Sequence, residues 1–532
     1  MSSTSNRPRA RSGLRTGSMV LLAAAVVGCS GGGTATSAPT GAPSSEAPSA
    51  TSDAPTVLTI GYNTEPGTLD PYQANGVVEF NLNVNISDGL FTTNELLEPV
   101  PNLAETATQV DPLTWEFKLR EGVKFHNGEP FTSESVKASY EYSMREDLPI
   151  KNQWGNDINL DSIEIVDDYT VRFVTTEPTP FMLARISNDH FMMPPEWLAA
   201  ATEDVLAREP VGTGAYRFAS WTTGTEVVLE ANPDYWGDPK PTIDQVIFKI
   251  LPDESTRVAN LRTGAVDLVN YVSPSSVSVV EQEPGLKVLT VESGRRVYAG
   301  MNTKVGPMGD VRVRQAINYG ANIEAVTETI LAGATSRLIN FVEEGFRSPD
   351  VKGYSYDPDK ARALLAEAGY PNGIDITWDV DGRGYLARDQ FVEAISASLS
   401  EVGVRVTINR VDNAIMTENQ RDRKTNELYI RSNAAYFDPG LTFSALRPTF
   451  AGNGTQWENQ EFLDLLGKLW SGGTAEERLA WSHEAQPILM DEAPLLFLWR
   501  EPSFYGVNTE KLPAFEAPPD EKIRLNRLSV TN

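Results

Sequence analysis

The sequence predicts an α/β protein. Segments with alternating apolar and polar residues, such as 56–62 and 115–120, recur along the chain and are typical of half-buried strands. Helical patterns stand between them, and residues 374–411 predict a strand, a helix and a strand in succession. A chain of 532 residues has room for roughly three domains of about 150 residues each, so a large core can form.

The start of the chain differs in composition from this α/β body. Residues 1–28 predict a secretory signal, because an arginine-rich start is followed by the apolar run 19–27, which is too short to span a bilayer. The only cysteine, Cys29, follows Gly28 in an arrangement that resembles the bacterial lipobox. That resemblance implies cleavage before Cys29 and lipid attached to it, which would anchor the protein to the membrane. Residues 29–55, rich in Ser, Gly, Ala, Thr and Pro, predict a disordered tether.

The first half of the body favours antiparallel strands. Two hairpins, 161–176 and 214–232, are predicted from paired strand patterns around short polar turns. Strands over 244–251 and 286–291 follow, with a helix between them that ends at Gly264.

The second half reads more plainly as alternating strands and helices. Asp357 and Pro358 predict the start of a helix, with a capping side chain followed by a proline in the first turn. The strand–helix–strand unit 374–411 comes next. A helical stretch over 461–492, interrupted by a Ser-Gly-Gly sequence, precedes a buried strand at 494–500.

Charge and motif content exclude several function classes. The 72 acidic and 45 basic residues give a net charge of −27, which argues against binding to nucleic acid. The three histidines are far apart in sequence, so they predict no metal site, and the chain has no phosphate-binding glycine loop. We therefore expect no cofactor and no enzymatic activity. Carboxylate pairs of the kind used by glycosidases occur in any chain with 72 acidic residues, so their presence is no evidence for or against glycosidase activity.

Six segments of the chain resemble, in order, the signature regions of one protein family. They are 63–71 (NTEPGTLDP), 115–142 (beginning WEFKLREG), 209–218 (EPVGTGAYRF), 231–250 (ANPDYWGD onward), 311–326 (VRVRQAINYGANIEAV) and 356–373 (YDPDKARALLAEAGYPNG). The family is solute-binding family 5, the peptide and nickel binding proteins of ABC importers. The resemblance extends from about residue 56 to residue 500. Within these motifs we expect Gly212, Gly214 and His126 to serve the scaffold rather than a ligand.

The resemblance implies a bilobal clamp of the periplasmic-binding-protein type, class II, enlarged by an extra subdomain. Lobe I would combine 56–89, 210–301 and 501–532, and the subdomain would be inserted over 90–209. Lobe II would span 302–500, joined to lobe I by two hinge crossings. The implied protein is an extracytoplasmic monomer that captures a peptide or similar small solute by domain closure and delivers it to a permease and its ATPase subunits.

The resemblance also suggests ligand-binding residues. Peptide-binding members have a loop in which an acid for the ligand amino group precedes an acidic-Pro pair, whereas this chain has Ala435 at the expected acid and keeps Asp438-Pro439. A buried ammonium would lack its counter-charge there, so sugars, metal chelates and other small solutes stay open beside peptides. The candidate ligand-binding residues are Asn63, Glu65, Arg295, Tyr298, Arg383, Tyr385, Asn433, Tyr436 and Asp438.

Two alternatives come from other functional classes. The chain could be a secreted lipoprotein hydrolase that uses a carboxylate pair on glycosides or esters. It could also be a surface adhesion or signalling protein that kept the fold without transport.

Overall fold

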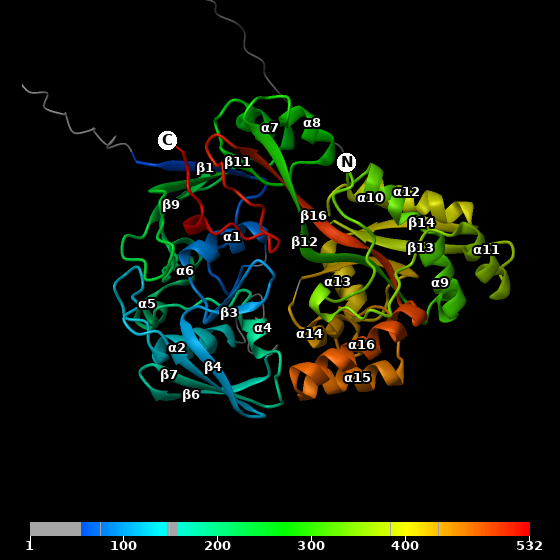
Figure 1. Cartoon of the computed structure of the whole chain (residues 1–532), viewed down its shortest axis with the longest axis horizontal. Helices are drawn as coiled ribbons and strands as arrows, with labels where there is room; N and C mark the ends of the chain where they lie inside the picture. The colour runs from blue at the N-terminus through cyan, green and yellow to red at the C-terminus, as the bar shows by residue number, and fades with distance from the viewer. Residues whose placement is uncertain are drawn as a thin grey trace, which may run out of the picture. The chain divides into compact units, whose positions relative to one another are not determined.

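One mixed sheet of ten strands runs through the computed structural model, which describes residues 55–74, 76–145, 148, 158–382, 385–434, 436–450 and 452–531 (Figure 1). From one edge to the other the strands are β14 (Val404–Val411), β13 (Ile374–Asp381), β15 (Leu428–Asn433), β12 (Leu286–Met301), β16 (Leu495–Asn508), β11 (Leu268–Val269), β1 (Val57–Tyr62), β10 (Gln245–Ile250), β9 (Glu226–Ala231) and β8 (Tyr216–Thr222). Parallel and antiparallel pairs both occur: β1 lies parallel to β10 and β11, and β13 parallel to β14 and β15.

The two longest strands, β12 and β16, connect the two ends of this sheet. They pair antiparallel over most of their length, side by side in Figure 1. The first part of β12 pairs with the part of β16 that also contacts β11, and the last part of β12 pairs with β15 on its other side. The register shifts between Glu292 and Arg296 and again after Val297. Such shifts bend a strand locally, so the sheet changes direction at β12 and β16, between its two halves.

Separate hydrophobic cores divide the body into three regions, and the two largest make the fold bilobal. Lobe I is built around Leu58, Ile60, Phe248 and their neighbours, and lobe II around Trp378, Ile430 and theirs. Lobe I carries α1 (Val77–Ile86), α7 (Glu254–Arg262) and α8 (Val277–Val280). Lobe II carries α9 (Val311–Gly320), α10 (Ile323–Thr329), α11 (Pro358–Glu367), α12 (Arg388–Glu401), α13 (Asn413–Arg421), α14 (Pro439–Phe443), α15 (Gln460–Ser471) and α16 (Ala475–Glu492).

The third region, called the four-stranded subdomain below, has its own antiparallel sheet. That sheet has the order β4 (Ala104–Asp111), β5 (Thr114–Leu119), β7 (Thr170–Thr175) and β6 (Leu160–Asp167). Around it lie the strand pair β2 (Phe91–Thr93) and β3 (Pro99–Pro101), and the helices α2 (Ser133–Ser143), α4 (Met182–Ile186), α5 (Pro195–Ala200) and α6 (Glu203–Arg208). Its core, with Phe117 and Phe173 at the centre, draws its buried residues from Leu90 to Met192.

The structure confirms the elements predicted from sequence and lengthens two of them. Both hairpins form, and β13, α12 and β14 are the predicted strand–helix–strand unit. Asp357 caps α11, since its carboxylate accepts a hydrogen bond from the Lys360 amide. The predicted strands 286–291 and 494–500 are the starts of β12 and β16, which continue to Met301 and Asn508 because pairing between them sustains the less apolar halves.

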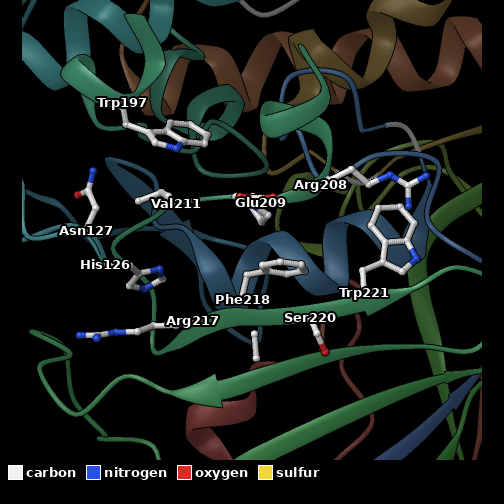
Figure 2. Close-up of a pocket in the computed structure, with 12 residues that line it drawn as sticks. His126, Asn127, Trp197, Arg208, Glu209, Val211, Arg217, Phe218, Ser220 and Trp221 are labelled. Carbon is white, nitrogen blue, oxygen red and sulfur yellow. The ribbon is translucent and has the colours of Figure 1, made fainter. Parts of the chain in front are cut away.

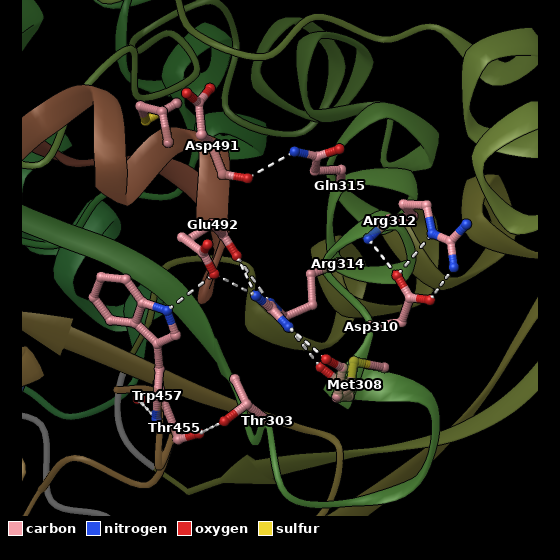
Figure 3. Close-up of polar contacts among 12 residues, drawn as sticks. Thr303, Met308, Asp310, Arg312, Arg314, Gln315, Thr455, Trp457, Asp491 and Glu492 are labelled. Carbon is pink, nitrogen blue, oxygen red and sulfur yellow. Dashed lines mark hydrogen bonds and ion pairs between the residues drawn. The ribbon is translucent and has the colours of Figure 1, made fainter. Parts of the chain in front are cut away.

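Within lobe II, the side chain of Arg314 on α9 connects separate segments of the chain by hydrogen bonds (Figure 3). Its guanidinium donates to the backbone carbonyls of Met308 and Glu492 and to the Glu492 carboxylate, at 2.9, 2.9 and 3.2 Å. Trp457 reaches the same Glu492 carboxylate from another segment. A buried arginine that donates to several carbonyls joins separate turns of the chain, so Arg314 serves the packing of lobe II.

Some predictions fall on residues outside the described part of the chain. These are the signal over 1–28, Cys29, the tether up to residue 54, Arg383 and Ala435. Within the described ranges, none of the helices combines the length and the apolar character needed to cross a bilayer.

Candidate functional site

Two cavities share a wall in the segment that follows β15. The first cavity has a volume of about 310 Å³ and the second about 410 Å³, and Ala434 and Tyr436 line both. The first is also lined by Val77, Phe80, Asn81, Thr93, Leu97, Ala184, Asn188, Asp189, Gly294, Arg295, Phe437, Pro519, Asp520, Glu521 and Lys522. The second is also lined by Asn159, Arg185, Arg431, Ser432, Asn433, Leu441, Ser444, Ala445, Arg447, Thr449, Phe450 and Trp470.

The second cavity lies where the four-stranded subdomain meets lobe II, and the first lies between these two regions and lobe I. Phe181, just before α4, contacts Trp470 of α15 with ring centroids 4.6 Å apart. The Arg185 guanidinium of α4 lies 5.8 Å from the centre of the Tyr436 ring. Phe181 is only 1% exposed, so the contact with Trp470 helps to bury it. A small molecule in either cavity would therefore touch residues from both regions.

In the first cavity the charged side chains have charged or polar protein partners. Arg295, at the register shift of β12, donates to both carboxylate oxygens of Glu521, at 2.9 and 2.7 Å. Asp189 pairs with Arg185 at 3.0 Å and Asp520 with Arg524 at 2.7 Å. Burial acts to lower the pKa of Arg295, but the Glu521 and Glu501 carboxylates outweigh it and raise that pKa above its ordinary value.

The second cavity has a different charge balance. Of the described residues that line it, three are arginines, Arg185, Arg431 and Arg447, and none is an aspartate or glutamate. Arg431 donates to the Gln420 side chain at 2.7 Å, and the Arg447 guanidinium stacks 3.9 Å from the centre of the Trp470 indole. Among the ion pairs of the described residues, none involves Arg431 or Arg447. Burial lowers the pKa of Arg447, and the Glu177 carboxylate partly offsets this effect.

Four predicted ligand-binding residues lie at or directly behind these cavities. Arg295 lines the first, Asn433 the second, and Tyr436 both. Tyr298 stands behind them, and its hydroxyl donates to the Asn433 side-chain oxygen at 3.1 Å. Tyr298 thus orients Asn433 from the buried side of β12 rather than facing either cavity.

Three other predicted residues are placed elsewhere. Glu65 accepts hydrogen bonds from the Trp221 indole at 3.0 Å and the Gly224 amide at 2.9 Å, so it fastens the β8–β9 hairpin. Asn63, two residues before it, lines neither cavity. Tyr385 is buried in the core of lobe II. The structure thus places Asn63, Glu65 and Tyr385 away from the lining of the two cavities.

Asp438 also departs from its expected role. Its carboxylate caps α14 by accepting from the Leu441 amide at 3.0 Å, and it forms an ion pair with Arg478. Burial raises the pKa of Asp438, while Arg478 and the amide bonds act in the opposite direction. A carboxylate already engaged by a helix terminus and an arginine is not free to receive a ligand ammonium, so Asp438 does not replace the acid absent at position 435.

Sequence reasoning missed Arg431, Arg447, Trp470 and the segment Pro519–Lys522. A signal existed for Arg431, because a charged residue interrupts the apolar run at the end of β15 directly before the loop. Arg447, Trp470 and the tail segment carry no local pattern. Pairing and packing between distant parts of the chain bring them to the cavities.

A third cavity, of about 600 Å³, lies away from these two (Figure 2). Its polar groups are largely occupied by the protein: Arg208 stacks 3.7 Å from the centre of the Trp221 ring, and Arg217 donates to Asn232 and Asp234. His126 contacts the Gly214 carbonyl through Nε2 at 2.9 Å, and burial lowers its pKa to about 4. This confirms that His126 serves the scaffold, and it leaves the third cavity few free polar groups.

Gly212 and Gly214 beside this cavity are needed for close contact. A side chain at either position would collide with the carbonyl oxygens of Ile86 and Asn85 at the end of α1. Both were expected to serve the scaffold, and neither does so through a positive φ. The close approach explains them instead.

Across the described ranges, no group of three or more His, Cys, Asp or Glu residues is arranged to hold a metal ion. The donor groups at the first two cavities are arginines, amides, hydroxyls and carboxylates already paired with cations. Such a set can hold a polar organic solute through hydrogen bonds and stacking, and it offers no arrangement typical of bond cleavage.

Comparisons with known proteins identify the family of the chain. The family described as bacterial extracellular solute-binding proteins, family 5 (middle), matches residues 98–455. The glutathione-binding protein GsiB of Pectobacterium atrosepticum is 28% identical over 476 residues, covering 85% of this chain and 90% of GsiB. The dipeptide-binding protein of Escherichia coli K12 is 27% identical over 471 residues, covering 82% and 86%.

A solved structure shares the fold over nearly the whole body. It is the ABC transporter-associated periplasmic binding protein DppA of Helicobacter pylori in complex with the peptide STSA, with a TM-score of 0.74 and 26% identity. The match covers 88% of this chain and 96% of that one. These relatives bind solutes, so the hydrolase and adhesion alternatives gain no support. The chain belongs to the bacterial extracellular solute-binding proteins of family 5, the substrate-binding components of ABC importers.

Proposed function

We propose that this protein captures a peptide or a similar small solute in the first and second cavities. The observation that carries the proposal is the shared wall at Ala434 and Tyr436, which joins two cavities lined by the four-stranded subdomain, lobe I and lobe II together. A ligand that contacts the subdomain and lobe I as well as lobe II favours the form in which these regions are close together. Closure then follows only to the extent that the solute binds the closed form more tightly than the open one.

The proposed hinge is the β12–β16 pair, where the register shifts between Glu292 and Arg296. We keep the predicted division into lobe I (56–89, 210–301, 501–532), inserted subdomain (90–209) and lobe II (302–500). It is supported by the separate cores and by the two sheets. Rotation at two adjacent strands would move the lobes as rigid bodies, and the permease would recognise the closed form.

The names of the relatives support a peptide-like ligand. GsiB is a glutathione-binding protein, the Escherichia coli relative binds dipeptides, and the Helicobacter pylori structure holds the peptide STSA. Ala435 removes the expected counter-charge for a ligand amine, so we do not expect a free amino terminus to dominate recognition here. Asn433, Tyr436 and Arg295 would contact the solute.

The test is a thermal-shift screen of the full mature protein. The panel contains glutathione, dipeptides, tetrapeptides including STSA, oligosaccharides and nickel chelates. Peptide-like probes should raise the melting temperature in a saturable manner, because a ligand that binds only the native state stabilises it. A panel without any saturable shift would overturn the proposed function, and a shift with oligosaccharides alone would reassign its ligand.

We further propose that lipid on Cys29 holds the protein on the outer face of the membrane through the tether 29–55, and that the protein acts as a monomer. The sequence of the signal and the single cysteine support the anchor. Labelling cells with an alkyne fatty acid should tag the natural chain and not Cys29→Ser, which should be released from the membrane. Light scattering on the released form should give the mass of one chain.

A further inference from the structure

We propose that the second cavity is an anion subsite, in which Arg431 and Arg447 bind a carboxylate of the solute and so select for ligands with net negative charge. This inference rests on the proposed function and specifies its ligand class. It concerns the two arginines that have no ion pair among the described residues, and it assigns them to the ligand rather than to the fold.

The charge of the cavity is opposite to that of the chain. The protein carries 72 acids against 45 basic residues, yet among the described residues three arginines and no acid line this cavity, and of the three only Arg185 has an ion-pair partner there, Asp189. Cations gathered in a partly desolvated space repel one another and lose hydration unless an anion joins them. In a chain with so many acidic residues, carboxylates are available to pair with these arginines. Because no described carboxylate pairs with Arg431 or Arg447, we infer that a ligand supplies the negative charge.

Arg431 is fixed in place with donor capacity to spare. It is on β15, its guanidinium lies 5.4 Å from the centre of the Phe450 ring, and its Nη1 donates to Gln420. Its Nε is buried without a hydrogen-bond partner among the described residues. A buried N–H left without a partner costs free energy, and a ligand oxygen would remove that cost.

Arg447 is held by stacking rather than by hydrogen bonds. Its guanidinium lies over the Trp470 indole, and the described residues provide no hydrogen-bond acceptor for its N–H groups. The carboxylate of Glu177 attracts it electrostatically, but Glu177 does not line the cavity. A guanidinium that is flat against an aromatic ring keeps its edge available, and that edge matches the two oxygens of a carboxylate.

Neutral groups complete the subsite. Ser432, Asn433, Ser444 and Thr449 supply amide and hydroxyl groups that can bind the rest of a peptide-like solute, and Trp470 and Phe450 supply apolar surface. In the sequence, position 435 has alanine instead of the acid expected for an amine. The absence of that acid, and two arginines without an ion pair among the described residues, both favour an anionic ligand.

The experiment compares two dipeptides, each acetylated at the amino end and amidated at the carboxyl end, so that the Glu side chain is the only carboxylate; they are called Ala-Glu and Ala-Gln below, and their binding to the full mature protein is measured by titration calorimetry. The natural protein should bind Ala-Glu roughly tenfold to a hundredfold more tightly, the range expected for charge-assisted hydrogen bonds. Raising the salt concentration should weaken Ala-Glu binding and leave Ala-Gln binding nearly unchanged. Glutathione, with two carboxylates and one amine, serves as a further anionic probe.

Arg431→Gln and Arg447→Gln should each reduce the preference for Ala-Glu to a few-fold or less. Arg421→Gln is the matched control, because Arg421 is exposed on α13, pairs with Asp422 and lines neither cavity. Circular dichroism establishes that each variant is folded. Equal affinity of the natural protein for the two dipeptides, or an unchanged preference in both cavity variants, would overturn the anion subsite while the capture of peptides stands. Absence of binding to every probe of the panel would overturn both proposals.

Discussion

The first and second cavities share Ala434 and Tyr436 but differ in how their charges are balanced. In the first, Arg295, Asp189 and Asp520 each have an ion-pair partner supplied by the protein. In the second, Arg431 and Arg447 have none among the described residues. Charges that the fold satisfies contribute to the fold, and charges that it leaves unsatisfied are available to a ligand. Stability measurements should therefore respond to the first set and binding measurements to the second.

The largest expected effect is on stability, at the first cavity. Glu521→Gln leaves Arg295 without its two-oxygen partner in a largely buried site, and Ser503 also loses an ionised acceptor. Without the Glu521 carboxylate, the buried positive charge of Arg295 lacks its counter-charge. We therefore expect the free energy of unfolding to fall by about 2–4 kcal/mol in urea titrations. Glu516→Gln, an exposed substitution in the same tail, is the control and should change little. Equal stability of the two variants would remove the distinction between the cavities.

A second effect depends on pH and comes from Glu501, next to the first cavity. Burial raises the pKa of Glu501 to about 7, although Arg295 and the Leu386 amide act to lower it. A carboxyl whose pKa is raised by folding stabilises the native state fully below its ordinary pKa of 4.5, and this contribution is lost as pH rises through 7. A shift from 4.5 to about 7 corresponds to about 3 kcal/mol.

The measurement is the free energy of unfolding between pH 4.5 and pH 8. Glu501→Gln should show a smaller decline over this interval than the natural protein, because its side chain does not ionise. Arg447→Gln leaves Glu501 and its surroundings in place, so it should follow the natural profile. Parallel profiles for Glu501→Gln and the natural protein would contradict the raised pKa.

The third prediction concerns the contact between the four-stranded subdomain and lobe II. Trp470→Ala removes the ring that covers Phe181 and supports Arg447. An aromatic pair contributes about 0.5–1.5 kcal/mol beyond its buried area, so solute affinity should fall roughly tenfold as the closed form loses this contact. Trp197→Ala, in the third cavity, is the matched control and should bind as the natural protein does in calorimetry. Unchanged affinity in the Trp470 variant would show that closure does not depend on this contact.

The smallest expected effect is the stability change of Arg447→Gln. No hydrogen bond or ion pair to a described residue is lost, so the free energy of unfolding should stay within about 0.5 kcal/mol of the natural value. Thermal unfolding without solute provides the measurement. A loss comparable to that of Glu521→Gln would mean that Arg447 is a structural residue and that the two cavities do not differ.

Local patterns were sufficient for most of the fold. Alternation identified β1, β5, β10 and the two hairpins, and the Asp-Pro pair identified the start of α11. Pattern alone did not reveal the length of β12 and β16, because the continuation of each strand is sustained by pairing with the other about 200 residues away. The family resemblance, rather than periodicity, predicted the two lobes.

The site was less predictable for the same physical reason. Arg295, Asn433 and Tyr436 lie at the cavities because the strands that carry them end there or bend there. Glu65 and Asp438 were expected at the site for their charge, yet a hairpin and a helix terminus use these carboxylates. Whether a charged side chain serves the scaffold or a ligand depends on its partners in space, which adjacent sequence does not specify.

The irregularity of β12 at Glu292–Arg296 has a mechanical consequence. Where its register is regular, the ladder with β16 resists bending, so rotation of one lobe against the other would concentrate at the irregular stretch from Glu292 to Tyr298. Arg295 is located there and grips the carboxyl-terminal tail through Glu521. A solute bound against that guanidinium would act directly on the irregular stretch of β12. No intermediate residues would be needed to couple binding to the movement of the lobes.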